Sequence, residues 1–121
     1  MGLFFEVCVR ELHLRNCVSV KEDKNLLDKS DLAKFLSMLD NAWEIVESKY
    51  LTRTIELDKF KTPLKLVQLI GNMAEEQWHH PELILGWGFV CVKIYTHELG
   101  GLLESDFIFA AKVDHIIATK L

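Results

Sequence analysis

The sequence lacks several features that would place the protein in a large functional class. Its 14 lysines and arginines against 18 aspartates and glutamates give a formal net charge of -4, without the basic patch that nucleic acid requires. No apolar run approaches the roughly 20 residues that span a bilayer. The start, "MGLFFEVCV", carries no positively charged leader of a signal peptide. We therefore expect no nucleic-acid partner and no membrane association.

Cysteine and metal-binding patterns are also sparse. The three cysteines are odd in number and have no C-x-x-C spacing, which favours free thiols in a reducing compartment. The stretch "HELGG" begins like H-E-x-x-H, but Gly101 stands where the second histidine is required. We expect no metal and a cytoplasmic location, with an organelle left open by the N-terminal segment. On spacing alone, Glu75, His79 and His97 remain an alternative ligand set.

The chain has 121 residues, half of them hydrophobic, which suits a single domain with one core. Its first 26 residues are the least regular part, with partial strand character in "FFEVCV" and a polar break at "KEDKN". We interpret residues 1–26 as an N-terminal extension and residues 27–121 as the folded domain. Because no candidate site residue lies before residue 27, we expect the domain to fold and function without the extension.

Apolar periodicity from Asp28 onward predicts alternating helices and strand pairs. "DKSDLAKFLSML" has helical spacing behind an Asp28 cap, and "NAWEIVESKYLTRTIEL" reads as two strands around a polar turn. Thr62 and Pro63 are typical of a helix start, and Pro81 should end that helix. "ELILGWGFVCVKIYT" reads as two further strands, and "LESDFIFAAKVDHIIATKL" as a final helix. The order α-β-β-α-β-β-α predicts an α+β domain, a four-stranded antiparallel sheet with three helices on one face.

Three histidines form the candidate site. Glu75 and His79 are four residues apart, so on a continuous helix they share a face, where the carboxylate can fix the histidine tautomer. His80 is extended because a proline follows it, so it points elsewhere. His97 follows the last strand, and two histidines facing one cavity suit proton transfer near neutral pH. The alternative is that each histidine merely ends an element and contacts water.

The spacing of these residues resembles that of the pterin-4a-carbinolamine dehydratases (4a-hydroxytetrahydrobiopterin dehydratases). The resemblance extends from about Leu27 to Ile117 and rests on Glu75, His79-His80-Pro81, Trp87, Thr96-His97, Gly101 and Asp106-Phe107. It implies removal of water from a 4a-hydroxytetrahydropterin to give quinonoid dihydropterin in tetrahydrobiopterin recycling. It also implies a homodimer or homotetramer and no cofactor, since the pterin is the substrate.

The resemblance also assigns roles to individual residues. His79 and His97 become the acid-base candidates, and His80 binds and orients the pterin as the third residue of the catalytic set. The supporting or substrate-binding residues are Glu75, Pro81, Trp87, Thr96, Glu98 and Asp106. An alternative within the same fold is a non-catalytic interaction module that assists transcription or assembly.

The sequence departs from the family pattern at three positions. Trp78 stands where an acidic residue is common, and Leu83 where an aromatic residue is common, so the rim of the pocket should differ. Leu103 replaces the usual serine or threonine cap of the last helix, which predicts a stability loss of about 1 kcal/mol.

Overall fold

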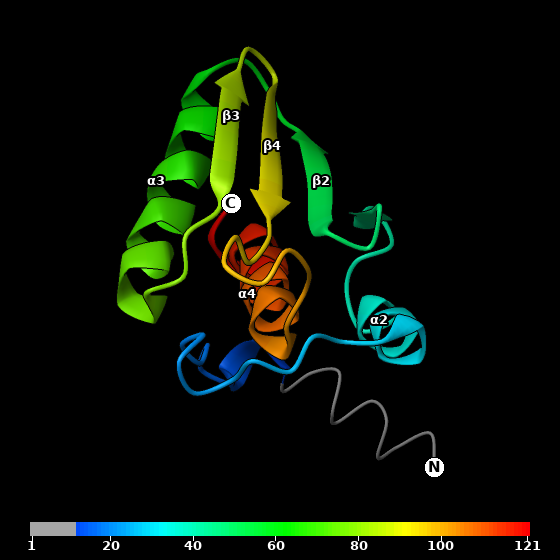
Figure 1. Ribbon diagram of the computed structural model, residues 1–121. Helices are drawn as coiled ribbons and strands as arrows, with labels where there is room; N and C mark the ends of the chain where they lie inside the picture. The colour runs from blue at the N-terminus through cyan, green and yellow to red at the C-terminus, as the bar shows by residue number, and fades with distance from the viewer. Residues whose placement is uncertain (1–11) are drawn as a thin grey trace.

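The computed structural model describes residues 12–121 (Figure 1). The strand character noted in "FFEVCV" therefore lies outside the described residues. After a short 3-10 helix, η1, the elements follow in the predicted order. They are η1 (Leu12–Leu14), α2 (Lys29–Leu36), β1 (Glu44–Val46), β2 (Tyr50–Glu56), α3 (Lys61–Gln77), β3 (Glu82–Gly86), β4 (Phe89–Ile94) and α4 (Glu104–Lys120).

The four strands form one antiparallel sheet in the order β1-β2-β4-β3, with the helices on one face, so the predicted fold class is confirmed. Helix α4 lies at the centre of the molecule, between α3, α2 and the sheet (Figure 1). Its Phe107, Phe109 and Val113 side chains are completely buried. They pack in one cluster with Leu51 of β2 and Val92 of β4, which forms the main core. Within residues 12–121, no helix has both the length and the apolarity needed to cross a membrane.

The helix ends show where local signals decide the structure and where they do not. Asp28 caps α2 as predicted, its carboxylate accepting a hydrogen bond of 2.8 Å from the amide of Asp31. Helix α3 begins at Lys61, so Thr62 lies inside the helix and is not its cap. Pro63 still falls in the first turn, where the amide hydrogen that proline lacks would have no partner within the helix.

The β3–β4 hairpin determines which segments meet at the site. Glu82 pairs with Lys93 at one end of the hairpin, and Gly86 pairs with Phe89 at the other. Because the strands are antiparallel, the residues just before β3 lie beside those just after β4. The sheet thus brings the histidine pair and His97 to the same end of the molecule.

Candidate functional site

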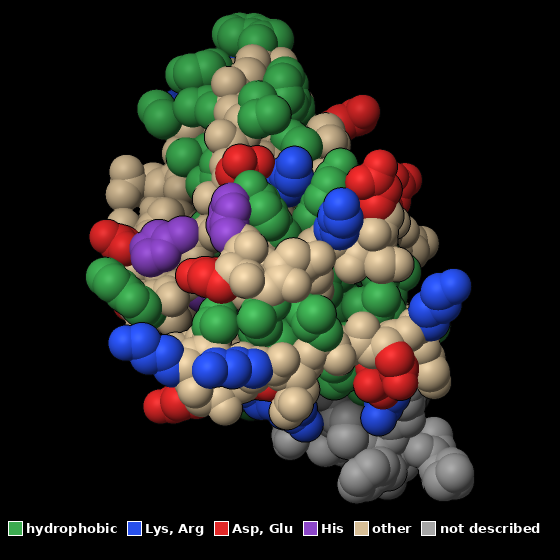
Figure 2. All heavy atoms as spheres, in the orientation of Figure 1, with side chains coloured by type: hydrophobic (Ala, Val, Ile, Leu, Met, Phe, Trp, Pro, Cys, Tyr) green, Lys and Arg blue, Asp and Glu red, His purple; other side chains and the backbone are tan. Residues whose placement is uncertain are grey.

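A pocket of about 500 Å³ opens at this end of the sheet. Figure 2 shows histidine side chains gathered on this part of the surface, with carboxylates next to them. The volume lies in the range of small-molecule sites, which is about 300–1,000 Å³. Three segments far apart in sequence contribute the lining residues: Ser19, Lys21, Trp78, His79, His80, Tyr95, Thr96, His97 and Glu98.

Trp78 sets the direction of the histidine pair. It ends α3 in the left-handed conformation, with φ 51° and ψ 41°, and the amide of His79 then bonds to the carbonyl of Ala74 at 3.2 Å. This conformation costs a non-glycine residue roughly 1 kcal/mol or more. The helix therefore ends at Gln77, four residues before Pro81, and the expected end at the proline is wrong. Such local strain is often found at functional sites.

His79 turns toward the start of α4 and contacts Asp106. Its Nε2 lies 2.8 Å from Oδ1 of Asp106, which is completely buried. The other oxygen of Asp106 accepts hydrogen bonds from the Thr96 hydroxyl at 2.9 Å and the Leu103 amide at 2.8 Å. Because a carboxylate only accepts, Nε2 of His79 donates this hydrogen bond, and in the neutral ring Nδ1 is then the acceptor.

His80 pairs with a different carboxylate, that of Glu75. Its Nε2 lies 2.6 Å from Oε2 of Glu75, and about half of its side chain is exposed. The expected pairing of Glu75 with His79 is therefore wrong. The four-residue spacing predicts a contact only on a continuous helix, and Trp78 ends the helix before His79. Two adjacent histidines thus have two different carboxylate partners.

His97 and Glu98 lie on the tight loop that follows β4. The bridge between Thr96 and Gly101 closes this loop, and the amides of Leu99 and Gly100 both bond to the Thr96 carbonyl. The exposed His97 ring packs against the Tyr95 ring, with 3.9 Å between the ring centroids. The loop carries His97 into the same pocket as the histidine pair.

Trp87 is the one predicted site residue that the structure places far away. It occupies the β3–β4 turn and is 72% exposed, roughly 16 Å from the histidine pair if each of the five β3 residues spans about 3.3 Å. Pro81 joins His80 to β3 without lining the pocket. The residues that sequence reasoning missed as site components are Ser19, Lys21 and Tyr95, together with Trp78, which it noted only at the rim. None of them belongs to a motif, so no local signal marks them.

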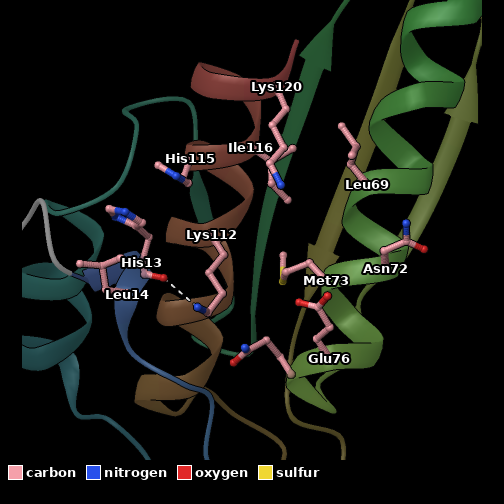
Figure 3. A pocket seen from close by; sticks show the side chains of 11 residues that line it. His13, Leu14, Leu69, Asn72, Met73, Glu76, Lys112, His115, Ile116 and Lys120 are labelled. Carbon is pink, nitrogen blue, oxygen red and sulfur yellow. Dashed lines mark hydrogen bonds between the residues drawn. The ribbon is translucent and has the colours of Figure 1, made fainter.

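A different pocket, of about 400 Å³, lies between η1, α3 and α4 and contains none of the predicted site residues (Figure 3). Among the described residues, no group of three or more histidine, cysteine, aspartate or glutamate side chains is arranged to hold a metal ion. Burial raises the pKa of the Cys17 thiol to about 12, so this thiol is protonated at neutral pH and is no nucleophile.

Comparisons with known proteins agree on one family. The family model described as Pterin 4 alpha carbinolamine dehydratase matches residues 25–116. Relatives provisionally named pterin-4-alpha-carbinolamine dehydratase include one from Alkaliphilus metalliredigens, 35% identical over 83% of this chain and 90% of its own. Another, from Rubrobacter xylanophilus, is 39% identical over 88% of this chain and 98% of its own.

A solved structure shows the same fold. It is described as a transcriptional coactivator/pterin dehydratase from Brucella melitensis, and it matches with a TM-score of 0.71 and 30% sequence identity. The match covers 76% of this chain and 98% of the other.

Proposed function

The chain belongs to the pterin 4 alpha carbinolamine dehydratase family, and from this premise we propose that it dehydrates 4a-hydroxytetrahydropterins to quinonoid dihydropterins. The observation that carries the proposal is the meeting of His79, His80 and His97 in one pocket of suitable size for a bicyclic ring. The reaction requires the two kinds of proton transfer that histidines perform near neutral pH.

The elimination breaks the bond between C4a and its hydroxyl oxygen. A proton must reach this oxygen so that it leaves as water, and the neighbouring ring nitrogen must lose its proton as the carbon–nitrogen double bond forms. In our proposal His79 and His97 carry out these two transfers. His79 is suited to this role because Asp106 fixes its Nε2 and leaves Nδ1 as the available nitrogen. His80, held by Glu75, binds and orients the pterin.

The proposal is tested by measuring dehydration of a 4a-carbinolamine with purified protein, before and after treatment with a chelator. We expect acceleration over the spontaneous reaction that the chelator leaves intact. His79→Ala and His97→Ala should each lower turnover by up to about 100-fold, given the usual contribution of acid-base groups. Because groups that act as a unit give non-additive losses, the double variant should lose much less than the product of the two single losses.

The same experiment separates the enzyme from a non-catalytic interaction module on this fold. That alternative is worth testing because the Brucella protein is described as a transcriptional coactivator as well as a pterin dehydratase. Folded protein, verified by circular dichroism, that leaves the spontaneous rate unchanged would favour the interaction module. Wild-type turnover in His97→Ala would remove His97 from the mechanism while leaving the dehydratase proposal in place.

A further inference from the structure

Residues 12–27, called here the N-terminal strap, cross the start of α4 and form one wall of the candidate site. In Figure 1 the strap is the blue trace that passes beside the orange first turn of α4. It contributes Ser19 and Lys21 to the pocket that holds the three histidines. The strap therefore does more than precede the domain.

The first part of the strap is fixed on α4. Leu12 is 1% exposed and packs against Ile108 and Ala111. Figure 3 shows the adjoining contacts, where Nζ of Lys112 donates a 2.7 Å hydrogen bond to the His13 carbonyl. The His13 ring also stacks on His115 of α4, with ring centroids 4.1 Å apart. Apolar burial, a hydrogen bond and ring stacking together hold this part of the strap against α4.

Hydrogen bonds hold the middle of the strap in place next to the segments that carry the histidines. The hydroxyl of Ser105, a residue only 1% exposed, accepts from the Val18 amide at 2.7 Å and donates to the Val18 carbonyl at 3.2 Å. The Cys17 amide donates to the side chain of Gln77, the last residue of α3, at 2.9 Å. These bonds fix the chain immediately before Ser19.

The segment that follows is a closed turn, and the strap is fixed again at its far end. The amides of Glu22 and Asp23 both donate to the Ser19 carbonyl, at 3.0 and 2.9 Å. Beyond this turn, the Leu27 amide donates to the Leu102 carbonyl at 3.0 Å. The backbone that carries Lys21 is thus held on both sides, and Lys21 itself is an exposed residue of the pocket lining.

We propose that Lys21 selects pterins whose C6 substituent carries an anionic group, a phosphate or a carboxylate. This inference rests on the proposed function, because it concerns the substrate of the same pocket. Among residues 12–121, no ion pair within 4 Å engages Lys21, so its ammonium is available to a ligand. Glu98 also lines the pocket, and because its carboxylate repels an anion, an anionic group is favoured beside Lys21 rather than beside Glu98.

Binding measurements with matched pterins test this inference. Calorimetric titrations would compare neopterin, which has a neutral side chain, with neopterin phosphate at low salt. We expect the dissociation constant to be about three- to fivefold lower for the phosphate, the range of a solvent-exposed ion pair. The difference should largely vanish at about 0.5 M salt, because salt screens exposed charges. Pteroylglutamate, titrated in parallel, shows whether a carboxylate is accepted in place of phosphate.

Two variants locate the effect. In Lys21→Met the preference for the phosphate should disappear, whereas Lys24→Met, which changes an exposed lysine outside the pocket lining, should retain it. The inference would be overturned if wild type and Lys21→Met preferred the phosphate equally, or if wild type showed no preference for it. Equal binding of both pterins by protein that still dehydrates the carbinolamine leaves the proposed function intact and removes only the role of Lys21. If folded protein binds none of the pterins, both proposals fail.

Discussion

Asp106 links three segments of the site through one buried carboxylate. One oxygen contacts His79 after α3, and the other accepts from Thr96 after β4 and from the Leu103 amide at the start of α4. All three hydrogen bonds have donor–acceptor distances between 2.8 and 2.9 Å, and Asp106 is completely buried. A change at this residue should therefore alter the orientation and tautomer of His79 as well as the local structure.

Asp106→Asn tests this positioning role. The amide has one accepting oxygen and one donating nitrogen, so it cannot accept from all three donors. If its nitrogen faces His79, the imidazole must accept at Nε2, and the ring hydrogen moves to the nitrogen that should act on the substrate. We expect kcat to fall by about 10- to 100-fold, the scale of a lost acid-base group, with a smaller change in KM. Steady-state kinetics and nitrogen NMR of the His79 ring measure both effects.

Thr96→Val is the matched control for Asp106→Asn. It removes one donor to Asp106 but keeps the carboxylate beside His79. We expect a small loss of stability, about 1 kcal/mol for a hydrogen bond, and retention of most of kcat. Equal losses of kcat in both variants would show that Asp106 acts through local structure alone.

The start of α4 shows why an unfavourable cap residue can be retained in a helix. Leu103 occupies the N-cap without a side-chain hydrogen bond, as the sequence predicts, but its side chain is completely buried. Its amide donates to the carboxylate of Asp106, which is the half of a capping box that the third residue of the helix supplies. Burying a leucine contributes about 2 kcal/mol, whereas a good cap contributes about 1 kcal/mol.

Leu103→Ser should consequently destabilise the protein although it introduces a favoured cap residue. We expect a net loss of about 2 kcal/mol in the free energy of unfolding, because the cavity left by leucine outweighs the cap gained. Urea unfolding measures this loss. Asp28→Ala, which removes the cap of the exposed α2, is the comparison and should lose about 1 kcal/mol. An increase in stability of Leu103→Ser would mean that capping outweighs burial at this site.

At the level of elements, the sequence predicts most of what local patterns determine. The strand pairs, the Asp28 cap and the final helix follow from periodicity and turn chemistry, and the structure confirms them. The end of α3 does not follow, since nothing about tryptophan marks Trp78 as a left-handed residue. In that conformation His79 contacts Asp106, which lies 27 positions further along the chain. No local stretch of sequence contains both residues. Because His79 is bound to Asp106, Glu75 pairs with His80 and not with His79 as the sequence predicts.

At the scale of the whole molecule, sheet order decides the composition of the site. Antiparallel pairing of β3 with β4 brings His97 to the histidine pair, and the same pairing sends Trp87 to the opposite end. The sequence could predict the hairpin but left the approach of His97 open. Nothing in it indicates that Lys21 reaches the pocket, because the strap is positioned by α3 and α4 residues far along the chain.

A partly buried ionic cluster joins the sheet to the central helix. Asp114 of α4 accepts hydrogen bonds from the Trp43 indole at 2.7 Å, from Arg53 of β2 at 2.5 Å and from the Asp40 amide at 2.9 Å. Despite these donors, burial raises the pKa of Asp114 above its ordinary value, because desolvation of the carboxylate outweighs the hydrogen bonds and the charge of Arg53. The cluster should therefore make the stability of the whole fold depend on pH.

The sign of this dependence follows from linkage. A group whose pKa is higher in the folded state binds more protons there, so its contribution to stability is complete below the unfolded value of 3.8 and is lost as pH rises through the folded pKa. In Asp114→Asn this contribution is absent. We expect the stability of wild type minus that of the variant to fall as pH rises from about 4 toward neutrality, measured by urea unfolding at several pH values. A difference that instead grows with pH would mean that the attraction of Arg53 outweighs burial and holds the Asp114 pKa below its ordinary value.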